Sequence, residues 1–217
     1  MYLLAILIAM PLVAAAAPDI DQRQPYSAAR ASSAAADGSN GDMATVPPRS
    51  SHVVADIRGA GRIVHMWFTI ATEEPNYLST TRMQIFWDGS AAPAVDVPFG
   101  EFHLLGHNAV RQVNTAFITV EARPELNNNL ANRNVGGFNC YFPMPYAKGA
   151  RIVIGNGSEK PLRALYFQID YQKWPTEPSP MRFHATHSRT KPETYPGPEA
   201  GQRDAKNPDG RGNHLIL

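Results

Sequence analysis

The chain has 217 residues, which allows one large or two small domains, and 43% of them are hydrophobic, enough for a sizeable core. Its formal net charge of +1 argues against a nucleic-acid partner, because binding to a polyanion requires an excess of basic side chains. One cysteine excludes an internal disulfide framework, and 19 prolines with 16 glycines are typical of a chain with many turns.

The chain begins with an apolar segment that has the main features of a signal peptide. Residues 2–13 are apolar apart from one tyrosine hydroxyl and are too few to span a bilayer, and the alanines at 14–17 offer A-x-A cleavage sites. The basic residues that usually precede such a segment are missing. We nevertheless predict a signal peptide at residues 1–17, a secreted or periplasmic protein, and no membrane span after cleavage.

The segments on either side of the central part of the chain are polar. Residues 18–52 are rich in Ala, Ser, Gly, Asp and Asn and are predicted to form an extended N-terminal arm. Residues 188–217 are predicted to form a linker that ends in Leu-Ile-Leu, like the start of a missing second sandwich. We therefore expect a fragment or a truncated gene product that exposes apolar surface and self-associates.

The central residues, 53–187, contain short β-branched and aromatic segments separated by turn signals. Residues 62–70 are almost continuously apolar, as in a strand buried on both faces, and residues 162–171 alternate cleanly between apolar and polar. No segment after residue 17 has the period of an amphipathic helix. The sequence predicts an all-β fold, an antiparallel jelly-roll β-sandwich, with strands near residues 53–57, 62–70, 82–87, 94–98, 116–120, 150–154, 162–171 and 181–187.

The most constrained stretch is residues 136–146, which combine four aromatic rings, the cysteine, an amide and two prolines. If its first part is a strand, Asn139 and Tyr141 share one side, whereas Phe138, Cys140 and Phe142 share the other. The apolar set suits the core, with a buried thiol, and the polar-tipped set suits a groove or a contact with another domain or subunit. The stretch is therefore either a strand that ends in a core-filling corner or the wall of a sugar-binding site.

Four acidic residues stand in contexts that suit a glycosidase, which needs two carboxyl groups on either side of one bond. Asp88 precedes a glycine and is predicted to be a turn residue, Asp96 lies in a short strand, and Asp170 is expected to be a hydrogen-bonded structural acid. Glu101 lies between aromatic residues just after a glycine and is a candidate binding residue. Glu101 and Tyr171 are placed, on weaker grounds, on the same surface as the polar-tipped pair.

Two pairs of histidines and one glycosylation sequon are the other motifs in the chain. His103 and His107 are four residues apart, but the Leu-Leu-Gly between them argues against a helix, and His184 and His187 would face opposite sides of a strand. We expect no metal and no cofactor. Residues 156–158, Asn-Gly-Ser, match the sequon, which matters only if the turn is exposed.

Five groups of residues carry a resemblance to a known family. They are Gly59–Ile63 with Trp67–Thr69, Phe86–Gly89, Val97–Phe102, Gly137–Tyr146 and Leu165–Tyr171. Their order and spacing resemble the N-terminal half of glycoside hydrolase family 172, formerly a domain of unknown function (DUF 2961), over residues 32–187. The GFNCYFPMPY segment is the most specific of the five.

The resemblance implies tandem jelly-roll sandwiches that assemble as trimers or hexamers, with active sites near subunit contacts. It also implies retaining hydrolysis of α-D-fructofuranosides, difructose dianhydrides or α-D-arabinofuranosides, with a furanoside oligosaccharide or glycan as the partner. The catalytic glutamates of the family belong to a later Gly-Thr-Glu-Asp-Tyr-like motif that this chain lacks, and Glu101 stands where many relatives have aspartate. We expect a glycosidase half that is inactive until completed; the alternative is a non-catalytic carbohydrate-binding or structural sandwich.

Overall fold

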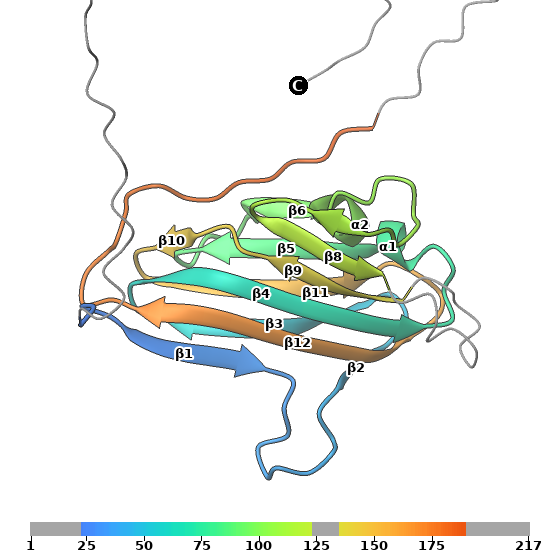
Figure 1. The fold of residues 1–217 in the computed structure, drawn as a ribbon, viewed down its shortest axis with the longest axis horizontal. Helices are drawn as coiled ribbons and strands as arrows, with labels where there is room; N and C mark the ends of the chain where they lie inside the picture. The colour runs from blue at the N-terminus through green and yellow to red at the C-terminus, as the bar shows by residue number, and fades with distance from the viewer. Residues whose placement is uncertain (1–22, 123–134, 190–217) are drawn as a thin grey trace, which may run out of the picture.

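The computed structural model describes residues 23–122 and 135–189, which form two antiparallel β-sheets around a shared core (Figure 1). The large sheet has the order β1-β12-β4-β9-β8-β7, with β2 paired to β12 and β10 paired to β4. Its strands are β1 (Ser27–Ser32), β2 (Ala44–Val46), β4 (Gly61–Thr72), β7 (Val113–Asn114), β8 (Ile118–Ala122), β9 (Gly136–Cys140), β10 (Met144–Tyr146) and β12 (Leu162–Lys173). The all-β prediction is confirmed.

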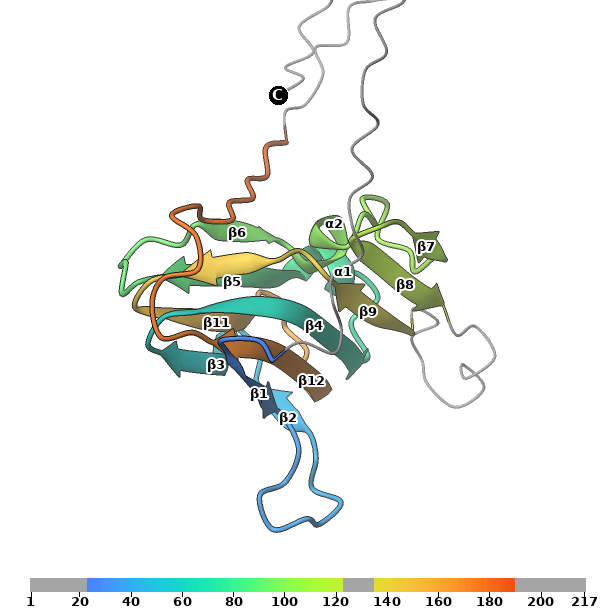
Figure 2. The same ribbon diagram turned by 60° about the vertical axis from the view of Figure 1, so that its left-hand side comes forward.

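The small sheet has the order β3-β11-β5-β6 and packs against the inner face of the large sheet. Its strands are β3 (Ser50–Arg58), β5 (Thr81–Trp87), β6 (Val95–Pro98) and β11 (Gly149–Asn156). Two one-turn helices, α1 (Tyr77–Thr80) and α2 (Phe99–Phe102), flank β5 and β6 at one end of the sandwich (Figure 2). In the part of the chain described here, no helix has the length and apolar character needed to cross a bilayer.

The connections between the sheets are those of a jelly roll. If β1, β3, β4, β5, β6, β9, β11 and β12 are counted from 1 to 8, the large sheet contains the order 1-8-3-6 and the small sheet the order 2-7-4-5. This is the double Greek-key arrangement of eight strands in two sheets. The predicted topology is therefore confirmed.

The segment predicted as an extended arm is part of the sandwich from Ser27 onward, which corrects both the arm and the expected start at residue 53. Strand β1 pairs with β12 over its whole length, from Ser27 opposite Lys173 to Ser32 opposite Gln168, and β2 pairs with β12 farther along (Figure 1). An edge strand is held mainly by backbone hydrogen bonds, so it does not need large apolar side chains. Composition alone therefore does not reveal β1.

The strand predicted at residues 181–187 is wrong, because this segment makes only an isolated bridge between Ala185 and Val95. Other contacts hold it instead. The Trp87 indole N–H donates to the carbonyl oxygen of Phe183 at 2.8 Å, and Arg182 donates through Nε to an Asp88 carboxylate oxygen at 2.7 Å. The predicted signal peptide at residues 1–17 and almost all of the predicted linker at residues 188–217 lie outside the described residues.

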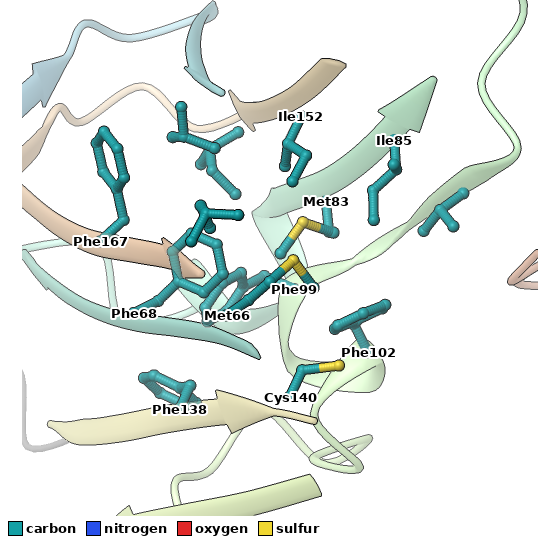
Figure 3. Packing of buried hydrophobic residues seen from close by; sticks show 14 of the residues in the cluster. Met66, Phe68, Met83, Ile85, Phe99, Phe102, Phe138, Cys140, Ile152 and Phe167 are labelled. Atoms are coloured by element: carbon teal, nitrogen blue, oxygen red, sulfur yellow. The ribbon is translucent and has the colours of Figure 1, made fainter. Parts of the chain in front are cut away.

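The core lies between the two sheets and is dominated by fully buried aromatic, aliphatic and sulfur-containing side chains. Met66 and Phe68 of β4 and Phe138 of β9 point into it, and the Phe99 ring of α2 packs edge-on against both phenylalanines at centroid distances of 5.7 and 5.0 Å (Figure 3). Each such side chain contributes about 1.5–3 kcal/mol when it is fully buried. The alternation predicted for β5 and β12 is confirmed, since the following residues are buried: Met83, Ile85, Trp87, Leu165, Phe167 and Ile169.

Strand β4 carries a bulge that changes which side chains reach the outer face of the large sheet. Asp170 of β12 is paired with His65, but the next residue of β12 is paired with Ile63, so Val64 is an extra residue in β4. On the other edge of β4, the ladder is interrupted between Cys140 at the end of β9 and Met144 at the start of β10. The prediction that this strand is buried on both faces is wrong, because its outer face is only half-buried.

The sequon asparagine, Asn156, ends β11 and is 2% exposed. Its amide nitrogen donates to the carbonyl oxygens of Val46, Pro47 and Lys160 at 2.9–3.2 Å, and its side-chain oxygen accepts from the Ser158 amide and hydroxyl. The side chain therefore ties the turn after β11 to the connection between β2 and β3. The exposed turn that a glycosylation site requires is not present.

Candidate functional site

Four neighbouring strands of the large sheet place polar side chains in a row on its outer face. Arg30 of β1 lies opposite Asp170 of β12, and Asp170 lies opposite His65 of β4. Asn139 of β9 lies beside them, and Tyr141 follows where the chain leaves β9. We call these five residues the His65 cluster.

Ionic contacts fix one end of the His65 cluster. The Arg30 guanidinium donates to both carboxylate oxygens of Asp170, at 2.6 and 3.0 Å, and His65 Nδ1 lies 3.0 Å from Asp170 Oδ2. The hydrogen bond from Arg30, helped by the one from His65, holds the pKa of Asp170 below its ordinary value, although partial burial opposes the shift. Asp170 is therefore a hydrogen-bonded, ionised acid, as its strand-end position predicts.

The other end of the cluster is made by the amide and the exposed ring. His65 Nε2 lies 3.1 Å from Asn139 Oδ1, and the His65 ring stacks on Tyr141 with 4.7 Å between centroids and 13° between planes. Because Nδ1–H donates to Asp170, a charged His65 also donates to Asn139, whereas a neutral His65 accepts from the same amide turned over. Tyr141 keeps 43% of its surface exposed.

The sequence around Tyr141 explains why its ring stands outside the sheet. The Tyr141 amide donates to the carbonyl oxygen of Phe117 at 2.7 Å, and Pro143 has no amide hydrogen with which to extend β9. The Phe142 ring turns the other way and stacks on the Phe117 ring at 4.6 Å. The chain therefore leaves the edge of β4 between β9 and β10, opposite the bulge.

The predicted alternation in β9 is confirmed. Phe138 and Cys140 are 0% and 1% exposed, whereas Asn139 and Tyr141 both contact His65 on the outer face. Burial raises the pKa of the Cys140 thiol to about 12, so this is the buried, unreactive thiol that its aromatic neighbours predict.

Glu101 lies in a different part of the molecule, beside a cavity of about 250 Å³. Its carboxylate oxygen is 2.6 Å from His187 Nε2. Residues from β6, α2, the start of the β9–β10 connection and the C-terminal segment line this cavity: Val97, Glu101, Phe102, Phe142, Phe183, Ala185, Thr186 and His187. We call it the Glu101 cavity.

The structure thus brings together two of the four candidate binding residues and separates the other two. Tyr171 is half-buried and packs against the core, because the alternation that points Asp170 outward points its neighbour inward. Glu101 is carried by α2 beside β6, so it faces the C-terminal segment. The expectation that Glu101 and Tyr171 share a surface with Asn139 and Tyr141 is corrected.

Sequence reasoning missed His65 and Arg30, which complete the His65 cluster. His65 is a polar residue in an otherwise apolar strand segment, and that interruption was a usable signal. Arg30 carried no such signal. Its contact with Asp170 depends on strand β1, and the polar composition of residues 18–52 does not reveal that strand.

The four acidic residues considered as glycosidase carboxylates are each held by a basic side chain. Asp88 also accepts backbone hydrogen bonds from residues 147–149 and has a φ of 57°, which confirms it as a turn residue. A retaining glycosidase holds its two carboxyl groups about 5 Å apart around one bond. In this chain each of the four acids instead forms an ion pair with a basic residue: Asp88 with Arg182, Asp96 with Arg82, Glu101 with His187, and Asp170 with Arg30 and His65.

The first histidine pair does not form a common site. His103 is 0% exposed, and its Nδ1 donates to the carbonyl oxygen of Phe99 at 2.8 Å, whereas His107 is exposed. Burial lowers the pKa of His103 to about 4. His103 is therefore a neutral core residue.

Comparison with known protein families agrees with the β-sandwich fold. A family model described as the GH172 first beta-sandwich domain matches residues 19–191. The chain belongs to glycoside hydrolase family 172. The match includes β1 and β2 as well as every later strand, and the resemblance seen in the sequence motifs is confirmed. No curated protein matches this GH172 chain.

Proposed function

We propose that this GH172 sandwich is the carbohydrate-contacting half of a secreted or periplasmic glycosidase whose catalytic carboxyl groups belong to a second sandwich. The proposed substrates are α-D-fructofuranosides, difructose dianhydrides or α-D-arabinofuranosides, cleaved with retention. The observation that carries the proposal is the Tyr141 ring, which stays 43% exposed while it stacks on His65.

The His65 cluster has the chemistry that a furanose ring requires. With one ring face against His65, Tyr141 has its opposite face for the C–H groups of a sugar and its hydroxyl for a hydrogen bond. Asn139 and the exposed edge of Asp170 provide amide and carboxylate groups for sugar hydroxyls. The contacts with Arg30 and His65 fix these groups in advance, so binding loses less side-chain entropy.

The pairing of the acidic residues supports the second part of the proposal. Asp88, Asp96, Glu101 and Asp170 are each bound to a different basic residue, which leaves none of them as an unpaired carboxyl group poised for catalysis. The same observation favours the alternative, a non-catalytic carbohydrate-binding or structural sandwich, equally well. Only an assay with the second sandwich separates the two.

The test compares the present chain with a longer protein in which a GH172 second sandwich follows it. We expect no hydrolysis of p-nitrophenyl α-D-arabinofuranoside or a difructose dianhydride by the chain alone, and retaining hydrolysis by the completed protein. Hydrolysis by the chain alone would place catalytic carboxyls in this domain. An inactive completed protein that still binds the sugars would favour the non-catalytic alternative.

The contribution of the His65 cluster is tested within the completed protein. Tyr141→Ala is expected to weaken furanoside binding about tenfold or more, because a sugar–aromatic contact is lost. The matched control is Tyr166→Ala, since Tyr166 is a tyrosine on the outer side of β12 that contacts Met43 rather than His65. Equal effects of the two substitutions would refute the assignment of the cluster.

Assembly is a separate part of the proposal. We propose a trimer or hexamer for the full-length protein, and self-association of the isolated chain through its exposed apolar side chains. The support is the presence of several such side chains at 44–70% exposure: Met43, Val53, Leu104, Phe117 and Met181. Light scattering that gives a monomer at high concentration would contradict the self-association.

A further inference from the structure

The Glu101 cavity has an apolar wall made of three phenylalanine rings. The Phe142 and Phe183 rings are 5.2 Å apart between centroids, and the Phe102 and Phe183 rings are 6.4 Å apart. The side chains of Val97 and Ala185 complete this wall. Rings in contact with one another form a continuous apolar surface against which the C–H face of a ligand can pack.

The polar side of the same cavity contains both hydrogen-bond acceptors and hydrogen-bond donors. The Glu101 carboxylate accepts hydrogen bonds, His187 supplies a ring nitrogen 2.6 Å away, and Thr186 adds a hydroxyl. A charged ligand would have to break the pairing of Glu101 with His187. A neutral polyol, by contrast, can donate to the other Glu101 carboxylate oxygen and exchange a hydrogen bond with the Thr186 hydroxyl while the Glu101–His187 pair stays intact.

Several contacts hold the C-terminal wall of the cavity in place without a ligand. The Trp87 indole N–H donates to Phe183 O at 2.8 Å, and the Ala185 amide donates to Ala94 O at 3.2 Å. Arg182 adds an ion pair with Asp88 at 2.7 Å. The cavity is therefore formed in advance, which lowers the entropic cost of binding.

We propose that the Glu101 cavity binds one monosaccharide ring, at a site separate from the His65 cluster. Its volume of about 250 Å³ is below the roughly 300–1,000 Å³ of sites for drug-sized ligands, so it suits a single ring and not an oligosaccharide. The ring packs on the phenylalanines, and its hydroxyls bind Glu101 and Thr186. This inference takes its ligand class from the proposed function.

Methyl groups that line the cavity provide the test. Val97, Ala185 and Thr186 are observed by methyl NMR while D-fructose or methyl α-D-arabinofuranoside is titrated into the chain, with cyclohexanol as an apolar ligand of similar size. We expect both sugars to shift these methyl signals and cyclohexanol to bind more weakly. Cyclohexanol binding as tight as that of the sugars would overturn the assignment to a polyol.

Three substitutions locate the ligand. Glu101→Gln keeps the shape of the side chain and is expected to weaken binding about tenfold, because a charge-assisted hydrogen bond becomes a neutral one. Ala185→Phe fills the cavity and is expected to abolish the shifts, whereas Tyr141→Ala, in the His65 cluster, leaves them unchanged. Unchanged binding in Glu101→Gln would refute the proposal even if Ala185→Phe does not fold.

The outcomes for this inference and for the proposed function are distinct. Sugar-dependent shifts in the cavity methyls of a chain whose completed form hydrolyses no furanoside would support the inference and refute the enzyme assignment. Sugar binding that depends on Tyr141 and leaves the cavity methyls unshifted would refute the inference and support the His65 cluster as the carbohydrate contact.

Discussion

Two histidines on opposite faces of the large sheet lie in very different environments, one apolar and one polar. His103 is 0% exposed and lies among the Phe68, Phe99, Phe102 and Phe138 rings, with centroid distances of 4.5–6.4 Å. Its Nε2 has no hydrogen-bond partner in the described residues. On the outer face, both nitrogens of His65 have polar partners.

The two environments meet at adjacent residues of β9. Phe138 contacts His103 on the inner face, and Asn139 contacts His65 on the outer face. An imidazole surrounded by phenyl rings must stay neutral, because nothing there compensates the cost of a buried charge. On the outer face, by contrast, a carboxylate and an amide provide hydrogen-bond partners for both ring nitrogens of His65. The inner face therefore carries stability, and the outer face is free to carry binding.

The largest expected effect is that of Cys140→Asp on the inner face. The substitution buries a carboxyl group without a partner, and we expect a loss of about 4 kcal/mol in the free energy of unfolding, measured by urea denaturation. Cys140→Ala, which only shortens the side chain, is the control and should lose much less. A loss below about 1 kcal/mol for the aspartate would show that Cys140 is not in the core.

The second effect is the pH dependence that His103 imposes. The unfolded chain binds a proton near pH 6.5, but burial lowers the pKa of His103 in the fold to about 4. Its contribution to stability is therefore fully present above pH 6.5 and is lost as the pH falls toward 4, by about 3 kcal/mol. Urea denaturation at several pH values measures this loss. His103→Leu should flatten the profile, and an unchanged slope in that variant would assign the dependence to other groups.

Asn139→Ala should have a smaller effect on stability. It removes one side-chain hydrogen bond to the half-buried His65, for which we expect a loss of about 1 kcal/mol by urea denaturation. It should also weaken furanoside binding in the completed protein. If it destabilises the chain as much as Cys140→Asp does, Asn139 is a buried structural amide and the contrast between the faces is wrong.

The smallest effect on stability is expected for Tyr141→Ala. Its ring is largely solvated and stacks only on His65 among the aromatic contacts described here, so we expect a loss of about 0.5 kcal/mol. Tyr141→Phe keeps the stacked ring and should preserve stability. Thermal melts of the three proteins check the order, and a larger loss in Tyr141→Phe than in Tyr141→Ala would contradict it.

Much of the fold was predictable because a strand that is buried on one side has a sequence that alternates between apolar and polar residues. The alternation in β5, β9 and β12 identifies strands and their inner faces, as Met83, Phe138 and Phe167 show. Strand β1 was not predictable, since its pairing with β12 uses backbone groups that every residue has. The prediction of a strand at residues 181–187 failed for the opposite reason. The segment has strand-like residues, but side-chain contacts hold it in place instead of a strand ladder.

The candidate site was predictable only within one strand. Alternation in β9 placed Asn139 and Tyr141 on one side, but sequence distance says nothing of which strands lie next to β9. His65 and Asp170 reach these residues through strand order and through a bulge that shifts β4 by one residue. Glu101 was misplaced because the sequence does not show that α2 lies beside the C-terminal segment. Tyr171 was misplaced because its alternation with Phe167 and Ile169 puts it on the inner face.

The buried turn at Asn156 matters for the choice of a production host. Oligosaccharyltransferase modifies the amide nitrogen of Asn in an Asn-X-Ser/Thr sequon, and here that nitrogen makes three hydrogen bonds inside the fold. In a eukaryotic secretory pathway the enzyme would meet the tripeptide before β11 has paired. A glycan attached then would replace one of the two amide hydrogens that serve these carbonyls, and its bulk would keep the turn open. In such a host, the yield of correctly folded protein depends on whether β11 pairs before Asn156 is glycosylated. A host without N-glycosylation avoids this side reaction.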